Sequence, residues 1–77
     1  MVDMKAVDAR REKLGIPKTV IATKCGVTVN TYDNWIKNPD NVSGRHCRTL
    51  ADSLAITDTN DILAIFFVPN VQENVNN

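Results

Sequence analysis

The sequence predicts an all-α protein, a single small bundle of about five helices. Apolar residues recur at helical spacing in five segments, and residues that typically cap or end helices separate those segments. A chain of 77 residues suffices for one small domain with a modest core. We place this domain at residues 1–68 and assign residues 69–77, which are mostly polar, to a flexible tail.

The first two predicted helices are separated by a turn at Gly15. The first covers about residues 3–14, and glycine is a common residue just past a helix end. Pro17 fits the first turn of the second helix, because that position needs no backbone N–H donor. Gly26 ends the second helix. Its apolar face is formed by Val20, Ile21, Ala22 and Cys25.

A third helix is expected over residues 29–37. Thr28 is placed to cap it, since a threonine hydroxyl accepts a hydrogen bond from a free backbone N–H of the first turn. Pro39 ends it, because proline disfavours the helical conformation in the residue before it. The apolar face of this helix is formed by Tyr32, Trp35 and Ile36.

Two more helices are expected in the second half of the chain. Ser43 is a plausible cap for the fourth, and either Asp58 or Thr59 for the fifth, which ends before Pro69. The fourth has an apolar stripe of Cys47, Leu50, Ala51 and Leu54. The apolar run over residues 62–68 is also rich in strand-forming residues, so a C-terminal strand is the alternative. We favour a helix because Asp61 fits an acidic first turn.

The charged residues are unevenly distributed along the chain. Nine basic and nine acidic residues give no net charge. All nine basic residues lie in residues 1–48, together with five acids, so this part carries +4, whereas residues 49–77 carry −4. The asymmetry favours an anionic partner for the first part, and an ordinary solvated surface is the alternative.

Metal, cofactor and enzyme chemistry find little support. A disulfide framework or zinc site needs more cysteines at closer spacing than Cys25 and Cys47, even though His46 adjoins the latter. The chain has a single histidine and no glycine-rich phosphate loop, so we expect no catalytic site and no cofactor. It also lacks a signal peptide and an apolar run that could span a membrane, which predicts a soluble, cytoplasmic protein.

The second and third helices with their short connection predict a helix-turn-helix unit, whose second helix enters the major groove of DNA. Gly26 permits the turn, and the small Ala22 lets the two helices approach closely. Asparagine pairs with adenine through two hydrogen bonds, and the methyl groups of valine and threonine touch that of thymine. Asp33 lies on the same side, and either accepts from cytosine or stays in solvent.

The order and spacing of these residues resemble the Cro/repressor-type helix-turn-helix family, often called XRE-like, of phage and bacterial regulators. The matching residues are Ile21, Ala22, Gly26, Val27, Thr28, Tyr32, Trp35, Leu50, Ala51, Leu54, Ala55 and Ile56. The resemblance covers about residues 4–66 and implies a lambda repressor-like bundle. It also implies that major-groove contacts come from Val29, Asn30, Thr31 and Asn34, and phosphate contacts from Lys18 and Thr28.

Three departures from the family pattern mark a divergent member. Arg11 stands where the family often has an arginine, but Ile36 replaces the glutamate that would pair with it. Pro17 replaces the usual capping serine or threonine of the second helix. Asn38 replaces a glycine, at a position where asparagine tolerates the left-handed backbone conformation nearly as well.

Further DNA contacts and a dimer are expected from the rest of the chain. In this fold the start of the fourth helix passes near the DNA backbone, so candidate phosphate contacts are Lys37, Arg45 and Arg48, with exposed solubility charges as the alternative. One small helix cannot bury the whole apolar run over 62–68, so we expect a dimer interface made by Ile62, Ile65, Phe66 and Phe67. A two-fold dimer would place two reading helices about 34 Å apart, on a palindromic operator.

The function expected from these features is a sequence-specific regulator of transcription that binds double-stranded DNA. It would be a phage Cro-like protein or a short repressor, acting on the nucleoid in the cytoplasm of a bacterial host. The chain leaves no room for a second, ligand-sensing domain, so no small-molecule ligand is expected. The alternative is a protein-interaction module of the same fold, such as an antitoxin or anti-repressor. The zero net charge and Asp33 favour that alternative.

Overall fold

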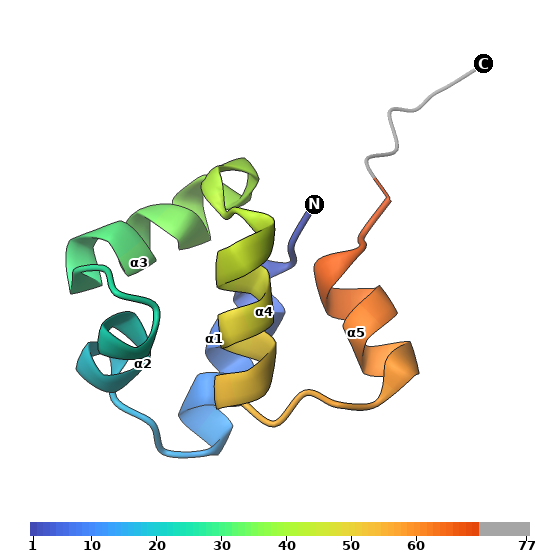
Figure 1. The fold of residues 1–77 in the computed structure, drawn as a ribbon, viewed down its shortest axis with the longest axis horizontal. Coiled ribbons are helices and arrows are strands. Elements are labelled where there is room, and N and C mark those ends of the chain that lie inside the picture. Colours follow the sequence, from blue (N-terminus) through green and yellow to red (C-terminus); the bar gives the residue numbers. More distant parts are fainter. Residues whose placement is uncertain (70–77) are drawn as a thin grey trace.

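The computed structural model describes residues 1–69, which form the predicted all-α bundle (Figure 1). The elements are α1 (Met4–Lys13), α2 (Lys18–Lys24), α3 (Val29–Lys37), the 3-10 helix η1 (Pro39–Asn41), α4 (Gly44–Ser53) and α5 (Thr59–Phe66). The apolar run over 62–68 is helical as far as Phe66, so the alternative of a strand is wrong. Most of the predicted tail, residues 70–77, lies outside the described residues.

Side-chain caps fix where most of the helices begin. The hydroxyl of Thr28 accepts from the backbone N–H of Thr31 at 3.2 Å, as the sequence predicts for α3. Of the two candidates for α5, the cap is Asp58. The other side-chain caps are Asp3 of α1 and Ser43 of α4. Helix α2 begins one residue after Pro17 and has no side-chain cap, in agreement with the departure seen in the sequence.

The backbone between the helices differs from expectation at Asn38. Gly15 and Gly26 take the left-handed conformation expected of them, both with φ of +71°. Asn38 does not, because its φ is −132° and its ψ is 75°. The following Pro39 disfavours a helical or left-handed residue before it, and the chain continues into η1. The residue that takes the left-handed conformation without being glycine is Ala55, after α4, with φ of +54°.

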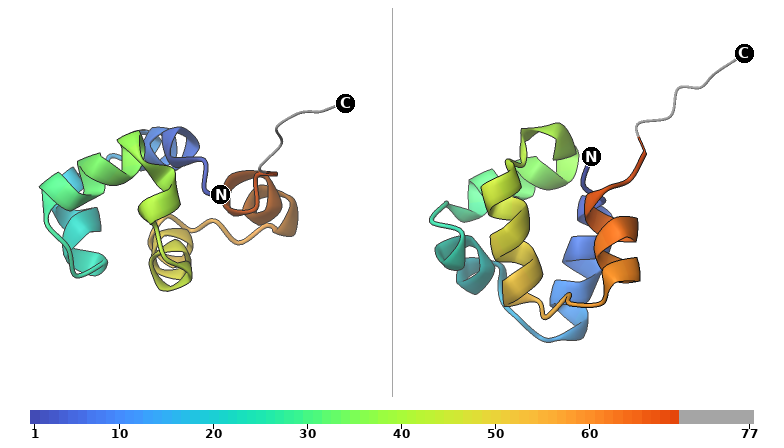
Figure 2. Two further views of the ribbon diagram at one scale, coloured as in Figure 1. Left: turned by 90° about the horizontal axis from the view of Figure 1, so that it is seen from above. Right: turned by 45° about the vertical axis from the view of Figure 1, so that its right-hand side comes forward.

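The core is formed where α1, α2, α3 and α4 meet. Fully buried side chains come from each of these helices: Val7, Ile21, Tyr32 and Leu50. Helix α5 lies at the edge of the bundle beside α1 and the N-terminal segment (Figure 2). Two backbone hydrogen bonds join that segment to the end of α5, from Asp3 N to Ile65 O at 2.6 Å and from Val68 N to Met1 O at 3.0 Å.

A buried polar cluster joins α1 to α3 and orients the latter. Arg11 is only 8% exposed, and its Nε donates to Asp8 Oδ1 at 2.7 Å. The Tyr32 hydroxyl donates to the same oxygen at 2.9 Å. Arg11 Nη1 donates to the backbone oxygen of Ile16 at 2.8 Å. Arginine thus finds its carboxylate on its own helix, and Tyr32 provides the link to α3 that Ile36 cannot make.

Candidate nucleic-acid interface

Helices α2 and α3 form a compact unit at one end of the molecule (Figure 1). The chain leaves α2 through hydrogen bonds from Gly26 N to Thr23 O and from Val27 N to Ala22 O, each 3.0 Å long. The left-handed conformation of Gly26 then redirects it into α3. Ala22 is buried, as expected for a small residue that allows the two helices to approach closely.

One face of α3 is firmly anchored. Tyr32 and Trp35 are both buried and meet edge to face, with ring centroids 6.3 Å apart. On its other side, Trp35 contacts the ring of His46 in α4, at a centroid distance of 4.8 Å. Trp35 is therefore a core anchor, as the hydrophobic pattern indicates, and the outward face of α3 is left to short polar side chains.

The four side chains predicted to read bases differ in their exposure. Asn30 and Asn34 are exposed, whereas Val29 and Thr31 are half-buried, and Val29 packs in part against the core. The hydroxyl of Thr31 shares a hydrogen bond with that of Thr28 at 3.1 Å. Asn38 Nδ2 donates to Asn34 Oδ1 at 3.0 Å, which fixes the orientation of that amide. The structure thus brings the four together on α3 and makes the two asparagines its most accessible members.

A salt bridge that the sequence did not reveal spans the two helices of the unit. Lys18 Nζ, at the start of α2, lies 2.8 Å from Asp33 Oδ1 in the middle of α3. Both side chains are about two-fifths exposed, at 40% and 41%. The hydrogen bond to Asp33 raises the pKa of the Lys18 ammonium above its ordinary value. Because the two residues lie 15 positions apart, no local sequence signal links them.

The other predicted phosphate contacts come from α3, from α4 and from the turn before α3. Lys37, in the last turn of α3, and Arg45, in the first turn of α4, are both exposed. Thr28 uses its hydroxyl to cap α3. Arg48 is exposed as well, but it lines a groove between α4 and α5.

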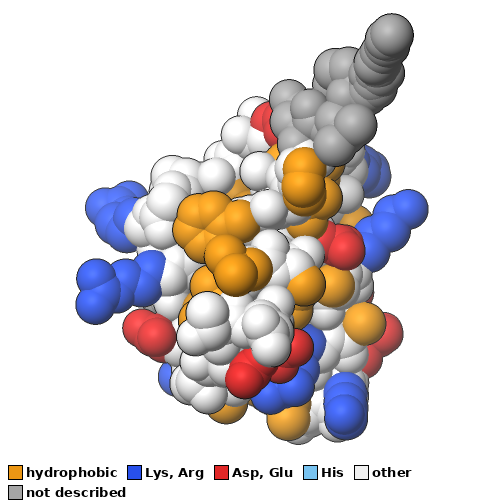
Figure 3. Space-filling model, turned by 90° about the vertical axis from the view of Figure 1, so that its right-hand side faces the viewer, with side chains coloured by type: hydrophobic (Ala, Val, Ile, Leu, Met, Phe, Trp, Pro, Cys, Tyr) orange, Lys and Arg blue, Asp and Glu red, His pale blue; other side chains and the backbone are white. Residues whose placement is uncertain are grey.

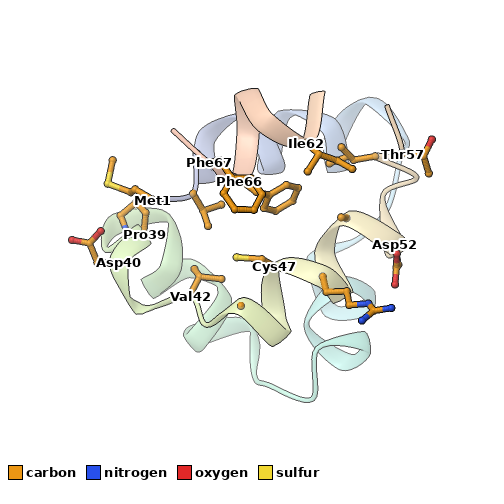
Figure 4. Close-up of a pocket in the computed structure, with 15 residues that line it drawn as sticks. Met1, Pro39, Asp40, Val42, Cys47, Asp52, Thr57, Ile62, Phe66 and Phe67 are labelled. Carbon is orange, nitrogen blue, oxygen red and sulfur yellow. The ribbon is translucent and has the colours of Figure 1, made fainter. Parts of the chain in front are cut away.

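This apolar groove has a volume of about 820 Å³. In Figure 4 it lies between α5, which contributes Ile62 and Phe66, and α4, which contributes Cys47. Hydrophobic side chains gather on this side of the molecule, with charged ones around them (Figure 3). Apart from Arg48, none of the predicted DNA-contact residues lines this groove.

The predicted dimer residues differ in the same way as the predicted base-reading ones. Phe66 is a core residue, only 7% exposed, and Ile62 and Ile65 are half-buried against the core. Phe67 is 65% exposed. Leu63, which is not among the predicted dimer residues, is 54% exposed. A surplus of apolar surface is therefore present, and it is concentrated on Phe67 and Leu63.

The described residues show no disulfide, metal-binding cluster or membrane-spanning helix. Cys25 and Cys47 are free and half-buried, and burial raises the pKa of both thiols. Among residues 1–69, no three side chains of the metal-binding types come together. Over the same residues, no helix combines the length and the hydropathy needed to cross a bilayer.

Comparison with known families agrees with this geometry. The family model HTH_3, described as helix-turn-helix, matches residues 7–59, which run from α1 to the first residue of α5. Comparisons with curated proteins and with solved structures gave no match. The matched region covers well over half of the chain and contains the whole α2–α3 unit. The chain therefore belongs to the Cro/repressor-type, XRE-like family of helix-turn-helix DNA-binding regulators.

Proposed function

We propose that this protein is a sequence-specific transcriptional regulator, a Cro-like protein or short repressor, that reads operator DNA in the major groove with α3. The observation that carries the proposal is the division of α3 into two faces. Tyr32 and Trp35 pack one face of the helix into the core, so its orientation would be maintained when the other face contacts DNA. The exposed amides of Asn30 and Asn34 project from the helix where base edges would be met.

Base reading would rest chiefly on the two asparagines. Among residues 1–69, the amide of Asn30 has no hydrogen-bonding partner in the protein, so both its donor and its acceptor are available to adenine. Asn34 must first release the hydrogen bond from Asn38 if its oxygen is to accept from a base. Val29 and the methyl group of Thr31 would add contacts to thymine, and each well-formed asparagine–adenine pair discriminates by about 1–3 kcal/mol.

Phosphate binding would come from residues around α3. Lys37 and Arg45 are exposed cations, and each phosphate contact steepens the dependence of affinity on salt by roughly 0.9 in a log–log plot. Thr28, at the start of α3, and Lys18, at the start of α2, would add further phosphate contacts. Arg48 is the weakest candidate of this group, because it lines the groove between α4 and α5.

A dimer completes the proposal, with a second copy of the chain covering the groove. Phe67 is 65% exposed and lines an apolar groove of about 820 Å³ on its own protomer. A two-fold axis brings each such side chain to the groove of the other copy, because in an isologous interface both partners contribute the same surface. Such a dimer would present two α3 helices to successive turns of one face of the DNA.

A protein-interaction module with little DNA binding is the second candidate. It is favoured by the zero net charge of the chain and by the carboxylate of Asp33 on the outward face of α3. In that case the groove between α4 and α5 would receive a different protein rather than a second copy. Antitoxins and anti-repressors of this kind would keep the fold and lose the affinity for DNA.

Fluorescence anisotropy with labelled DNA separates the two candidates. The probes are duplex from upstream of the protein's own gene and a pool of random duplexes, each titrated between about 50 and 200 mM salt. The proposal predicts tighter binding to the upstream duplex and a linear fall of log affinity with log salt. Absence of binding to either probe at the lowest salt would contradict the proposal and favour the protein-interaction module.

A further inference from the structure

The salt bridge between Lys18 and Asp33 lies on the surface proposed to meet DNA. Asp33 follows Asn30 by three residues and Val29 by four, so the three side chains share one strip of α3. Its carboxylate is about two-fifths exposed and is held 2.8 Å from the Lys18 ammonium. Among residues 1–69, the hydrogen bond from Lys18 goes to Oδ1, and Oδ2 receives none.

A carboxylate in this position has a narrow choice of partners. Phosphates repel it, and so do the base atoms that only accept hydrogen bonds, such as N7 and O6 of guanine and O4 of thymine. Adenine offers an amino group, but beside it stands the acceptor N7. Cytosine presents the N4 amino donor alone, and acidic side chains accept from it in the major groove.

We propose that Asp33 is a specificity-determining residue that accepts a hydrogen bond from the N4 amino group of a cytosine, and that Lys18 positions its carboxylate. This inference rests on the function proposed above. Lys18 donates to Oδ1, which leaves Oδ2 free to accept from a base, and its positive charge offsets the repulsion between Asp33 and the phosphates. Where the DNA offers no cytosine at this place, the carboxylate faces an acceptor and binding weakens, by about tenfold or more.

The test is a binding-site selection from a pool of random duplexes, carried out in parallel with the wild type and with Asp33→Asn and Asp33→Ala. The wild type should enrich a cytosine at one position of each half-site. Asparagine should change that preference to adenine, because it pairs with N6 and N7 of that base. Alanine should leave the position without preference while the neighbouring positions keep theirs.

The role of Lys18 is tested by a double-mutant cycle on the enriched duplex. Lys18→Met should weaken binding more when Asp33 is present than when it is replaced by asparagine, by about fivefold or more, because only then is a carboxylate left uncompensated. Lys24→Met is the matched control, since it removes the same charge from an exposed position of α2, and Lys24 forms no salt bridge with Asp33 among residues 1–69. Its effect should be equal in both backgrounds.

The outcomes are distinct. If Asp33→Asn and Asp33→Ala enrich the same cytosine as the wild type, the inference is wrong. It is equally wrong if both variants bind all duplexes more tightly and keep the same base preferences, because Asp33 would then be a repulsive charge only. A wild type that enriches no sequence and binds no duplex at low salt overturns the proposed function together with the inference. Circular dichroism verifies that each variant is folded.

Discussion

The carboxylate of Asp8 receives hydrogen bonds from two residues that the sequence does not obviously connect. Arg11 Nε lies 2.7 Å and the Tyr32 hydroxyl 2.9 Å from the same oxygen. Burial alone would raise the pKa of Asp8, but the hydrogen bonds from Arg11 and Tyr32 outweigh it and hold the pKa below its ordinary value. Burial and the neighbouring Asp8 raise the pKa of Tyr32. The stabilisation that this cluster contributes therefore depends on the ionised form of Asp8.

Removing that carboxylate should destabilise the protein markedly. Arg11 is 8% exposed, and in Asp8→Ala its guanidinium keeps the backbone contact to Ile16 and the longer 3.7 Å contact to the exposed Glu12, but loses its closest charge partner. We expect a loss of about 2–3 kcal/mol in the free energy of unfolding, measured by urea titration. Asp52→Ala is the control, since Asp52 is exposed on α4, and it should change stability by less than about 0.5 kcal/mol. Equal stabilities of the two variants would contradict this account.

The same carboxylate should make stability depend on acid. A group whose pKa is lower in the folded chain contributes its stabilisation fully above its unfolded pKa, about 3.9, and loses it as the pH falls through the lower folded value. Thermal unfolding followed from about pH 6 to pH 2 should therefore show a steeper loss for the wild type than for Asp8→Ala. Parallel curves would place the acid sensitivity in other groups.

At the scale of elements, the turn between α2 and α3 sets the placement of α3, the helix that we propose reads bases. Gly26 has φ of +71°, a conformation in which a side chain is strained even though a Cβ there would meet nothing within 4 Å. Gly44 offers a comparison, because it lies in the first turn of α4, also with open space around it and without a left-handed backbone.

Substituting each of these glycines by alanine should separate backbone strain from loss of space. Gly26→Ala should lower the free energy of unfolding by about 1–2 kcal/mol, since an L-residue in the left-handed region costs that much. Gly44→Ala should be neutral or stabilising by up to about 1 kcal/mol, because alanine is the better helix former. The measurement is thermal unfolding by circular dichroism. A Gly26→Ala variant as stable as Gly44→Ala would show that the turn tolerates side chains.

The sequence predicts helices well here because their signals are local. Thr28 and Ser43 cap helices through backbone groups three residues away, and the apolar spacing of α3 identifies its buried face. Contacts that depend on the packing of separate helices carry no such signal. Arg10 Nε donates to the backbone oxygen of Leu54 at 3.1 Å, across 44 positions, at the end of α4. The salt bridge of Lys18 and Asp33 is of the same kind.

At the scale of the whole molecule, the groove between α4 and α5 is the surface on which we propose that a second copy binds. The apolar run over residues 62–68 indicates that one small domain cannot bury every side of α5. It does not indicate which side chains turn inward, because that depends on how α5 lies against α1 and the N-terminal segment. Phe66 is 7% exposed and its neighbour Phe67 is 65% exposed, although the apolar pattern of the sequence predicts the same interface role for both.

The proposed dimer predicts a different outcome for Phe67 and for an unrelated exposed apolar residue. Phe67→Ala should weaken self-association about thirtyfold or more, as expected when an aromatic anchor of about 2 kcal/mol is lost. Leu14→Ala is the control, because Leu14 is 46% exposed at the end of α1. Sedimentation velocity measures association over a range of concentrations. A wild type that remains monomeric both free and on a two-half-site duplex would contradict the dimer.

The central claim, that α3 reads bases, is tested most directly by measuring the base preference of Asn30→Ala. The enriched duplex and its single-base variants are titrated with the wild type, with Asn30→Ala and with Asn60→Ala, a control on an exposed asparagine of α5. We predict that Asn30→Ala loses its preference at one adenine of each half-site, by about tenfold or more, with its circular dichroism spectrum and salt dependence unchanged. If Asn30→Ala keeps both the affinity and the base preference of the wild type, α3 does not read a base through Asn30 and the central claim is contradicted.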